Sequence, residues 1–188
     1  MKSLKVLGIF LVLAIAVFLL FIYSGVYNVA VTAGHSALTR RLIETAMKRS
    51  VRHHARKIQV PSLVDPAIVQ TGALSYDTMC SPCHGAPGAS FPEMAQGFDP
   101  QPPALAEEVK EWTTAELFWI TKHGIKLTGM PAWGPTHSDQ ELWEIVAFLE
   151  KLPTLSPADY QALTRPTKQT EGVMKREEPY EHRHRHRD

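Results

Sequence analysis

The N-terminal region is an uninterrupted run of apolar residues. Residues 6–22 carry no charged and no strongly hydrogen-bonding side chain. About 20 apolar residues in helical conformation cross a hydrocarbon core, and Tyr23 and Tyr27 extend the run to that length. The pattern therefore predicts a single transmembrane helix over residues 4–27.

A cleaved secretion signal is the alternative interpretation of this run. Lys2 and Lys5 precede it, and residues 31–33 (Val-Thr-Ala) resemble a cleavage site. The apolar stretch of a signal is usually about 7 to 15 residues long, which is shorter than this one. We therefore favour a retained membrane anchor.

Residues 36–58 repeat apolar side chains every three or four positions, which predicts an amphipathic helix. The repeating residues are Ile43, Met47, Val51, Ala55 and Ile58. Arg, Lys and His occupy the other faces of this basic helix. Either the apolar face packs under the next domain, or the helix lies on anionic headgroups or docks an acidic partner subunit. Pro61 and Pro66 break the pattern, so residues 59–65 are assigned to a linker.

Residues 66–153 show three helical segments and no convincing two-residue alternation, which predicts an all-α domain. The loops between the segments are rich in Pro and Gly, and Gly124 and Pro153 are plausible helix ends. The helix starts carry N-terminal capping signals: Asp65 before Pro66, Thr113 with Glu116, and Ser138 with Glu141.

The chain's two cysteines lie in one short motif, Cys-Ser-Pro-Cys-His over residues 80–84. This is the pattern of covalent haem attachment, in which both thiols bond to vinyl groups of the porphyrin and the imidazole ligates the iron. A disulfide would leave His84 without a role, and a thioredoxin-like pair would need a βαβ context. A zinc ribbon would need a second pair of ligands. The motif therefore predicts one haem c bound at Cys80, Cys83 and His84.

Met130 is the candidate ligand on the other side of the iron. It lies in the loop Gly129-Met130-Pro131, where glycine permits close backbone approach and proline stiffens the chain. The rivals are His123, which we expect at the surface in the last turn of a helix, and His137, which we expect to be solvent-exposed.

These residues together resemble a class I monohaem cytochrome c domain, and most closely the domains related to the third subunit of cbb3-type oxidases. The resemblance covers about half the chain, in particular these residues: Gly72, Tyr76, Cys80, Cys83, His84, Pro102, Pro103, Leu105, Met130 and the helix over 142–152.

The resemblance implies thioether bonds at Cys80 and Cys83, with His84 as proximal and Met130 as distal ligand. It implies that Gly72 and Tyr76 pack against the last helix near Leu142 and Val146. It also implies that the carbonyl of Pro102 or Pro103 accepts a hydrogen bond from the ligating imidazole, which orients the ring.

Haem would also enlarge the core of a domain this small. Five apolar side chains could cover it, although ordinary core packing is the commoner use of any one of them: Leu105, Trp112, Phe118, Trp119 and Trp133.

His/Met ligation fills both axial positions of the iron, so we expect an electron carrier and not an enzyme. Attachment by such motifs is known in this family from extracytoplasmic compartments, which predicts a haem domain in the periplasm, tethered to the bacterial inner membrane. Seven Arg and Lys at positions 40–57 follow the apolar run, so the positive-inside rule alone would place the domain in the cytoplasm. The haem-attachment motif overrules that prediction. The expected partners are respiratory or dehydrogenase proteins that donate and accept single electrons.

Two alternatives to a free carrier stay open. The protein could be the subunit through which electrons enter or leave one membrane oxidoreductase complex, with the basic helix and His35 as contact surfaces. His35 could also be a ligand or a quinone-site residue, although we expect simple exposure at a helix start. If Met130 is not a ligand, the haem would bind a gas or a peroxide, as in a sensor or a peroxidase.

Composition excludes other classes of function. The 188 residues include 20 Lys and Arg and 19 Asp and Glu, and a net charge of +1 gives no electrostatic case for nucleic acid. Residues 154–188 form a polar tail with a short helix expected around 158–163 and a disordered end. His182, His184 and His186 alternate there with arginines, whose charge opposes metal binding; an acidic partner is the alternative.

Overall fold

The computed structural model describes residues 2–165 and divides the chain into two units, Met1–Ala37 and Leu38–Asp188. The described residues contain helices and no strand, which confirms the predicted all-α class. The alternating His and Arg residues of the tail, His182, His184 and His186 among them, lie outside the described residues.

The first unit contains α1 (Lys2–Tyr23) and the short 3-10 helix η1 (Val31–Ala33). Within the described part of the chain, one helix, Ser3–Tyr23, is long and apolar enough to cross a membrane, and no residue of its most apolar stretch is buried. The helix ends four residues before the predicted limit of 27, because Gly25 adopts a φ of 69° that stops it.

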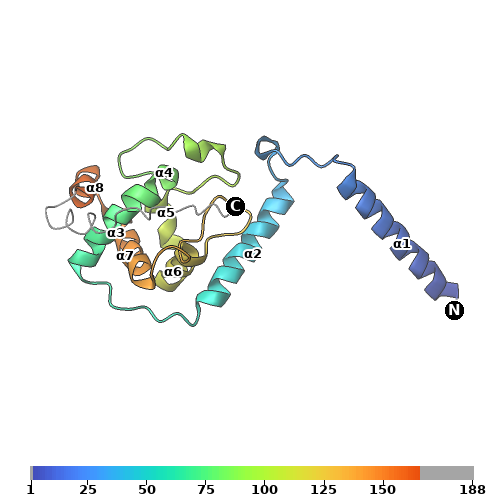
Figure 1. Ribbon diagram of the computed structural model, residues 1–188, viewed down its shortest axis with the longest axis horizontal. Helices are drawn as coiled ribbons and strands as arrows, with labels where there is room; N and C mark the ends of the chain where they lie inside the picture. The colour runs from blue at the N-terminus through green and yellow to red at the C-terminus, as the bar shows by residue number, and fades with distance from the viewer. Residues whose placement is uncertain (1, 166–188) are drawn as a thin grey trace, which may run out of the picture. The chain divides into compact units, whose positions relative to one another are not determined.

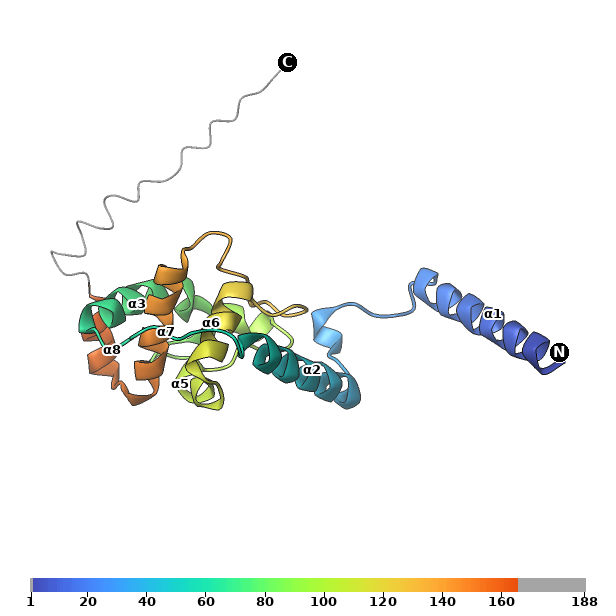
Figure 2. The same ribbon diagram turned by 90° about the horizontal axis from the view of Figure 1, so that it is seen from below.

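Apart from its first residue, α2 (Ala37–Ala55) belongs to the second unit, and its C-terminal end lies beside α6 (Thr114–His123) (Figure 2). Val51 and Ala55 are 1% and 2% exposed, and the His54 ring stacks on Trp119 with 5.5 Å between ring centroids. In the C-terminal half of α2, the predicted apolar stripe therefore packs against the domain that follows it in the sequence.

The core of the second unit forms where α3 (Pro66–Met79) crosses α7 (Asp139–Lys151), with α6 packed on α7 (Figure 1). The crossing is close because Gly72 has no side chain: a Cβ there would lie 1.9 Å from the carbonyl oxygen of Glu144. Tyr76 packs on Phe148, with 5.1 Å between ring centroids.

This crossing confirms the expectation for the first and last helices of the domain. Leu142 and Val146 on α7 are both 0% exposed and belong to the same buried cluster as Tyr76. Apolar residues from α3, α6 and α7 therefore share one continuous core.

The predicted capping signals are present at all three helix starts. The Asp65 carboxylate accepts a hydrogen bond from the backbone N–H of Ala67 at 2.9 Å. Full capping boxes form at the starts of α6 and α7, where Thr113 and Ser138 exchange hydrogen bonds with Glu116 and Glu141. Local side-chain chemistry thus fixes where these helices begin.

The folded domain continues beyond the predicted end at residue 153. The helix expected around 158–163 is present as α8 (Pro157–Thr164), and its Tyr160 is 5% exposed in the core. Tyr160 donates a hydrogen bond to Asp77 on α3 at 2.6 Å. The short helix expected within the tail is therefore present, and Tyr160 docks it on α3.

Five one-turn helices complete the described chain. They are α4 (Ser81–His84), η2 (Met94–Gly97), α5 (Leu105–Glu108), η3 (Val109–Glu111) and η4 (Leu152–Thr154). Each is too short to show a periodic pattern in the sequence.

Candidate functional site

Cys80, Cys83 and His84 lie on one short helical turn at the end of α3. The N–H of Cys80 donates to the Tyr76 carbonyl at 2.9 Å, and the N–H of His84 donates to the Cys80 carbonyl at the same distance. Both cysteines are free thiols, Cys80 buried and Cys83 half-buried. Burial raises the pKa of Cys80 to about 12, with a smaller contribution from Cys83, so the thiol is protonated at neutral pH.

The His84 ring is oriented by a backbone carbonyl. Its Nδ1 lies 2.8 Å from the carbonyl oxygen of Pro103, which can only accept a hydrogen bond, so Nδ1 carries the proton. Burial lowers the pKa of His84, and the bond to Pro103 opposes part of that shift. The ring is therefore neutral, with the lone pair of Nε2 directed away from Pro103. Of the two prolines expected here, Pro103 accepts this bond.

Side chains from α3 and α8 support this turn from behind. The Tyr76 hydroxyl donates to the Gly85 carbonyl at 2.8 Å, immediately after His84. Ser81 donates to the backbone carbonyl of Asp77 at 2.7 Å, and Tyr160 holds the Asp77 carboxylate. The first two bonds join α3 to the motif and to the residue that follows it, and the third joins α3 to α8.

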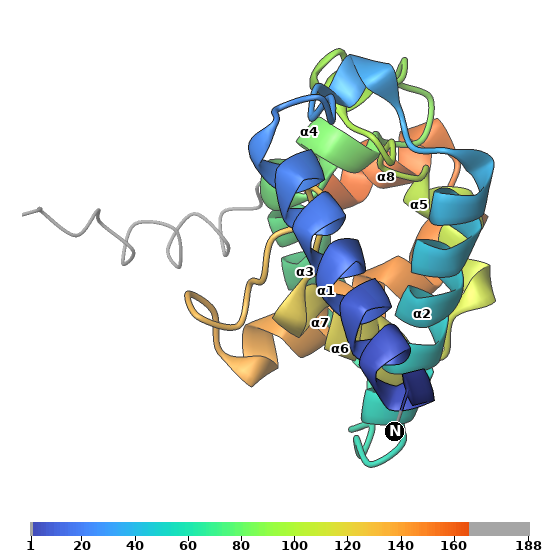
Figure 3. The same cartoon turned by 90° about the vertical axis from the view of Figure 1, so that its right-hand side faces the viewer.

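The loop that carries Met130 connects α6 with α7 and projects to one side of them (Figure 3). Its backbone is tied to the end of α6: Trp133 and Gly134 donate to the carbonyls of Thr121 and Lys122 at 3.2 and 2.9 Å. Within the loop, the Ile125 N–H donates to the Met130 carbonyl at 3.3 Å.

Two further contacts fix the conformation around Met130. Its backbone N–H donates to the Thr128 hydroxyl at 3.1 Å, and that hydroxyl donates to the Ile125 carbonyl at 2.8 Å. The ring of Phe98 packs against Gly129, where a Cβ would lie 2.2 Å from it. The loop is thus held by bonds on both sides of Met130.

Gly124 allows the loop to pack this closely against α6. Its φ is 64°, and a Cβ there would lie 2.7 Å from the carbonyl oxygen of Met130. Leu127 also adopts a positive φ, 62°, which is unusual for a branched side chain and costs conformational energy. The surrounding hydrogen bonds hold this turn in place.

Residues 67–149 match the family model described as cytochrome C oxidase, cbb3-type, subunit III. This segment is a c-type cytochrome domain. A c-type cytochrome domain binds haem c covalently, with iron at its centre, and supports electron transfer. A comparison with curated proteins finds no match for the chain.

The donor set in the cytochrome domain fits haem c. Two free thiols and a neutral imidazole lie on one helical turn, and this is the chemistry that covalent attachment and iron ligation require. The half-buried Met130 lies in a loop held by backbone hydrogen bonds, and a methionine thioether is a soft ligand of the kind that haem iron accepts.

The rival histidines lie in other surroundings. His123 is exposed, as expected, and its ring packs on Trp119 with 5.1 Å between centroids. His137 is half-buried, contrary to the expected full exposure, because its ring packs edge-on against Trp133 and its Nδ1 lies 2.9 Å from the Thr136 hydroxyl. His35 is exposed just before α2.

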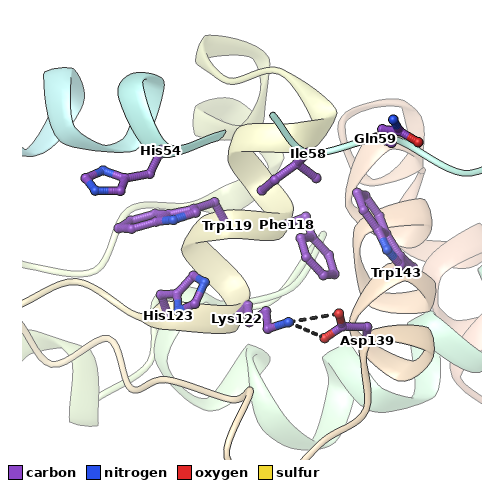
Figure 4. A pocket seen from close by; sticks show the side chains of 9 residues that line it. All are labelled: His54, Ile58, Gln59, Phe118, Trp119, Lys122, His123, Asp139 and Trp143. Carbon is purple, nitrogen blue, oxygen red and sulfur yellow. Dashed lines mark hydrogen bonds and ion pairs between the residues drawn. The ribbon is translucent and has the colours of Figure 1, made fainter. Parts of the chain in front are cut away.

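The residues expected to cover the haem divide into two groups. Leu105, Trp112, Phe118 and Trp133 belong to the domain core or pack against it. Trp119 instead faces α2, in a recess of about 390 Å³ shown in Figure 4. The recess is lined by His54, Ile58, Gln59, Phe118, Trp119, Lys122, His123, Asp139 and Trp143, which include none of the four predicted haem-binding residues.

Sequence reasoning missed three supporting residues. Thr128 and Phe98 fix the Met130 loop, and no local pattern marks either of them. Tyr160 holds Asp77, and its signal was the capping box of Ser156 and Asp159 that starts α8.

Proposed function

We propose that Cys80 and Cys83 bind the haem through thioether bonds and that His84 Nε2 and Met130 Sδ are its axial ligands. The fixed Met130 loop carries this proposal, because a ligand held by hydrogen bonds on both sides has little freedom to leave the iron. The carbonyl of Pro103 keeps His84 in one tautomer and one orientation.

This ligation supports a carrier of single electrons. The bound haem supplies an iron that alternates between its ferric and ferrous states, and a thioether ligand raises the reduction potential. With His84 and Met130 both bound to the iron, no position would remain on the metal for a substrate. The apolar core around the motif excludes water and favours the less charged, ferrous form.

We further propose that α1 anchors the chain in the bacterial inner membrane, with the cytochrome domain in the periplasm. The length and composition of Ser3–Tyr23 support the anchor. The domain would then pass electrons between membrane-linked respiratory partners. A permanent place in one oxidoreductase complex is the second candidate, because the matching family is described as an oxidase subunit.

Replacing Met130 tests the closed coordination. We expect Met130→Ala to keep pigment that resists acid and organic solvent, and to bind carbon monoxide rapidly in the ferrous state. Met94→Ala is the matched control, since Met94 is 61% exposed and its sulfur lies 4.0 Å from that of Cys83. Wild type and Met94→Ala should not bind carbon monoxide.

Two results would contradict the proposal. An unchanged ligand-field spectrum in Met130→Ala would show that Met130 is not a ligand. Rapid carbon monoxide binding by the wild type would favour a sensor or a peroxidase. For the location, cleavage of the cytochrome domain by protease added to spheroplasts, with α1 left in the membrane fraction, is the expected result.

A further inference from the structure

Net positive charge is concentrated in α2 and the two residues that follow it. Residues 37–57 contain seven Arg and Lys and one Glu, a net charge of +6. Because the whole chain carries +1, the other residues together carry −5. A segregation this strong directs α2 toward a negatively charged surface.

The cationic side chains lie on the face of α2 that points away from the domain. Leu38, Leu42, Thr45 and Arg49 follow one another at spacings of three or four, so they share one face of the helix. All four are exposed, whereas Val51 and Ala55 on the opposite face are buried. The packed and the cationic faces are therefore separate.

The arginines of the outer face are not engaged within the domain. Arg40, Lys48 and Arg52 pair with Asp99, Glu44 and Glu116, respectively. Among the ion pairs of the described residues, none involves Arg41, Arg49 or Arg56. These three charges are available to a binding partner.

The outer face also carries apolar side chains at the N-terminal end of α2, the end nearer in sequence to the predicted membrane span. Leu38 and Leu42 are 69% and 62% exposed. Leucines beside arginines are typical of a helix that lies in a membrane interface, with the apolar groups among the acyl chains and the charges at the headgroups. The combination favours a lipid interface over an acidic protein surface.

We propose that the outer face of α2, defined by Leu38, Arg41, Leu42 and Arg49 and continued by Arg56 directly after the helix, binds the anionic headgroups of the membrane in which α1 is anchored. The inference rests on the proposed anchor, because residues 24–36 can extend by no more than about 45 Å and so keep α2 near the bilayer. Binding would fix the orientation of the cytochrome domain, since the other face of α2 packs on α6.

Thiol labelling of the full holoprotein in nanodiscs tests this surface. Thr45 lies on the outer face between Leu42 and Arg49, and it is exposed. A Thr45→Cys variant would be labelled with a neutral polyethylene glycol maleimide. We expect labelling at least fivefold slower in nanodiscs with 30% phosphatidylglycerol than in pure phosphatidylcholine, and recovery of the rate in high salt.

Thr71→Cys is the matched control for the labelling site. Thr45 and Thr71 are both exposed helical residues whose hydroxyls donate to the carbonyl four residues earlier. Labelling of Thr71→Cys on α3 should not depend on the lipid. Equal rates for Thr45→Cys in both lipids would overturn the proposal, and so would protection confined to native vesicles, which would indicate an acidic protein partner.

Charge reversal supplies the second arm. Arg49→Glu with Arg56→Glu should abolish the lipid-dependent protection, whereas Lys110→Glu with Lys151→Glu, at exposed sites outside α2, should leave it unchanged. Equal effects of the two pairs would contradict a specific surface.

The experiment distinguishes a wrong assignment of α1 as membrane anchor from a wrong assignment of the outer face of α2 as lipid-binding surface. The haem spectrum and insertion into nanodiscs are measured first, and a chain that fails to insert contradicts the anchor alone. Co-sedimentation of that chain with the same anionic vesicles then decides the role of α2, since binding supports it and no binding overturns it.

Discussion

The two sides of the proposed haem site are held by different kinds of contact. The proximal turn, Ser81–His84, continues from α3 and is supported by the side chains of Tyr76 and Tyr160. The Met130 loop has no such helix of its own and is tied to α6 by backbone hydrogen bonds. The proximal side therefore depends on the helical core, and the distal side depends on the loop backbone.

This difference predicts which side fails when each support is removed. Substitutions that weaken the packing of α3 or α8 should lower the free energy of unfolding of the whole domain. The molecules that still fold should keep both iron ligands. Damage to the loop should open the iron to external ligands at a smaller cost in stability. Each variant is measured in the detergent-solubilised full chain.

Gly72→Val should have the largest effect, because it separates α3 from α7. A Cβ at Gly72 would lie 1.9 Å from the Glu144 carbonyl oxygen, and backbone atoms cannot move aside as a flexible side chain can. We expect a loss of more than about 4 kcal/mol and little holoprotein. Thr71→Val, at the exposed neighbouring position, should change the guanidinium midpoint very little. Normal stability of Gly72→Val would contradict the close crossing.

Gly124→Ala and Gly85→Ala compare the two sides directly. Both glycines combine positive φ with extended ψ, a conformation that costs alanine about 1–3 kcal/mol. A Cβ at Gly85 would meet only Pro92 at 3.6 Å, whereas one at Gly124 would lie 2.7 Å from the Met130 carbonyl oxygen. Gly124→Ala should therefore cost at least about 2 kcal/mol more and allow carbon monoxide to bind. Equal guanidinium midpoints for the two variants would show that the Met130 loop can shift to accommodate the added Cβ without loss of stability.

Tyr160→Phe should lower stability by about 2 kcal/mol without opening the iron. The substitution removes the hydrogen bond to the Asp77 carboxylate, a charged acceptor, at 2.6 Å. Burial and this bond raise the pKa of Tyr160, so the hydroxyl stays protonated and donates over the accessible pH range. Tyr76→Phe removes a bond to the neutral Gly85 carbonyl and should cost about 1 kcal/mol. Carbon monoxide binding by Tyr160→Phe would show that the proximal support also controls access to the iron, which contradicts the proposed independence of the proximal and distal sides.

Sequence reasoning succeeded where the chemistry is local. Capping pairs such as Thr113 with Glu116 lie three residues apart, and the motif at 80–84 is contiguous, so each can be recognised without tertiary contacts. The positions of Gly72 and Tyr76 against α7 followed from the family resemblance, and the structure confirms them.

The remaining features depend on contacts between distant parts of the chain. Nothing near Phe98 shows that its ring meets Gly129, and nothing near Tyr160 shows that it reaches Asp77. The choice between Pro102 and Pro103 needed the position of the His84 ring. The packing of α2 was left open because periodicity shows which face is apolar and not what covers it.

Ser138→Ala should have the smallest effect, at the point where the distal loop ends and α7 begins. Glu141 accepts hydrogen bonds from the backbone N–H and the hydroxyl of Ser138 at 2.6 and 2.7 Å, and we expect the loss of this cap to cost about 1 kcal/mol at pH 7. Ser156→Ala removes the equivalent box from α8 and is the matched control.

The pH dependence of this cap identifies the carboxylate as its partner. The bonds from Ser138 lower the pKa of Glu141 below its ordinary 4.5 in the folded state, so the unfolded chain binds the proton more readily. The stabilisation is complete above pH 4.5 and is lost as the pH falls through the lower, folded pKa. The difference in guanidinium midpoint between wild type and Ser138→Ala should therefore shrink below pH 4.5. A difference that stays constant into this acidic range would mean that the hydroxyl caps the helix without help from Glu141.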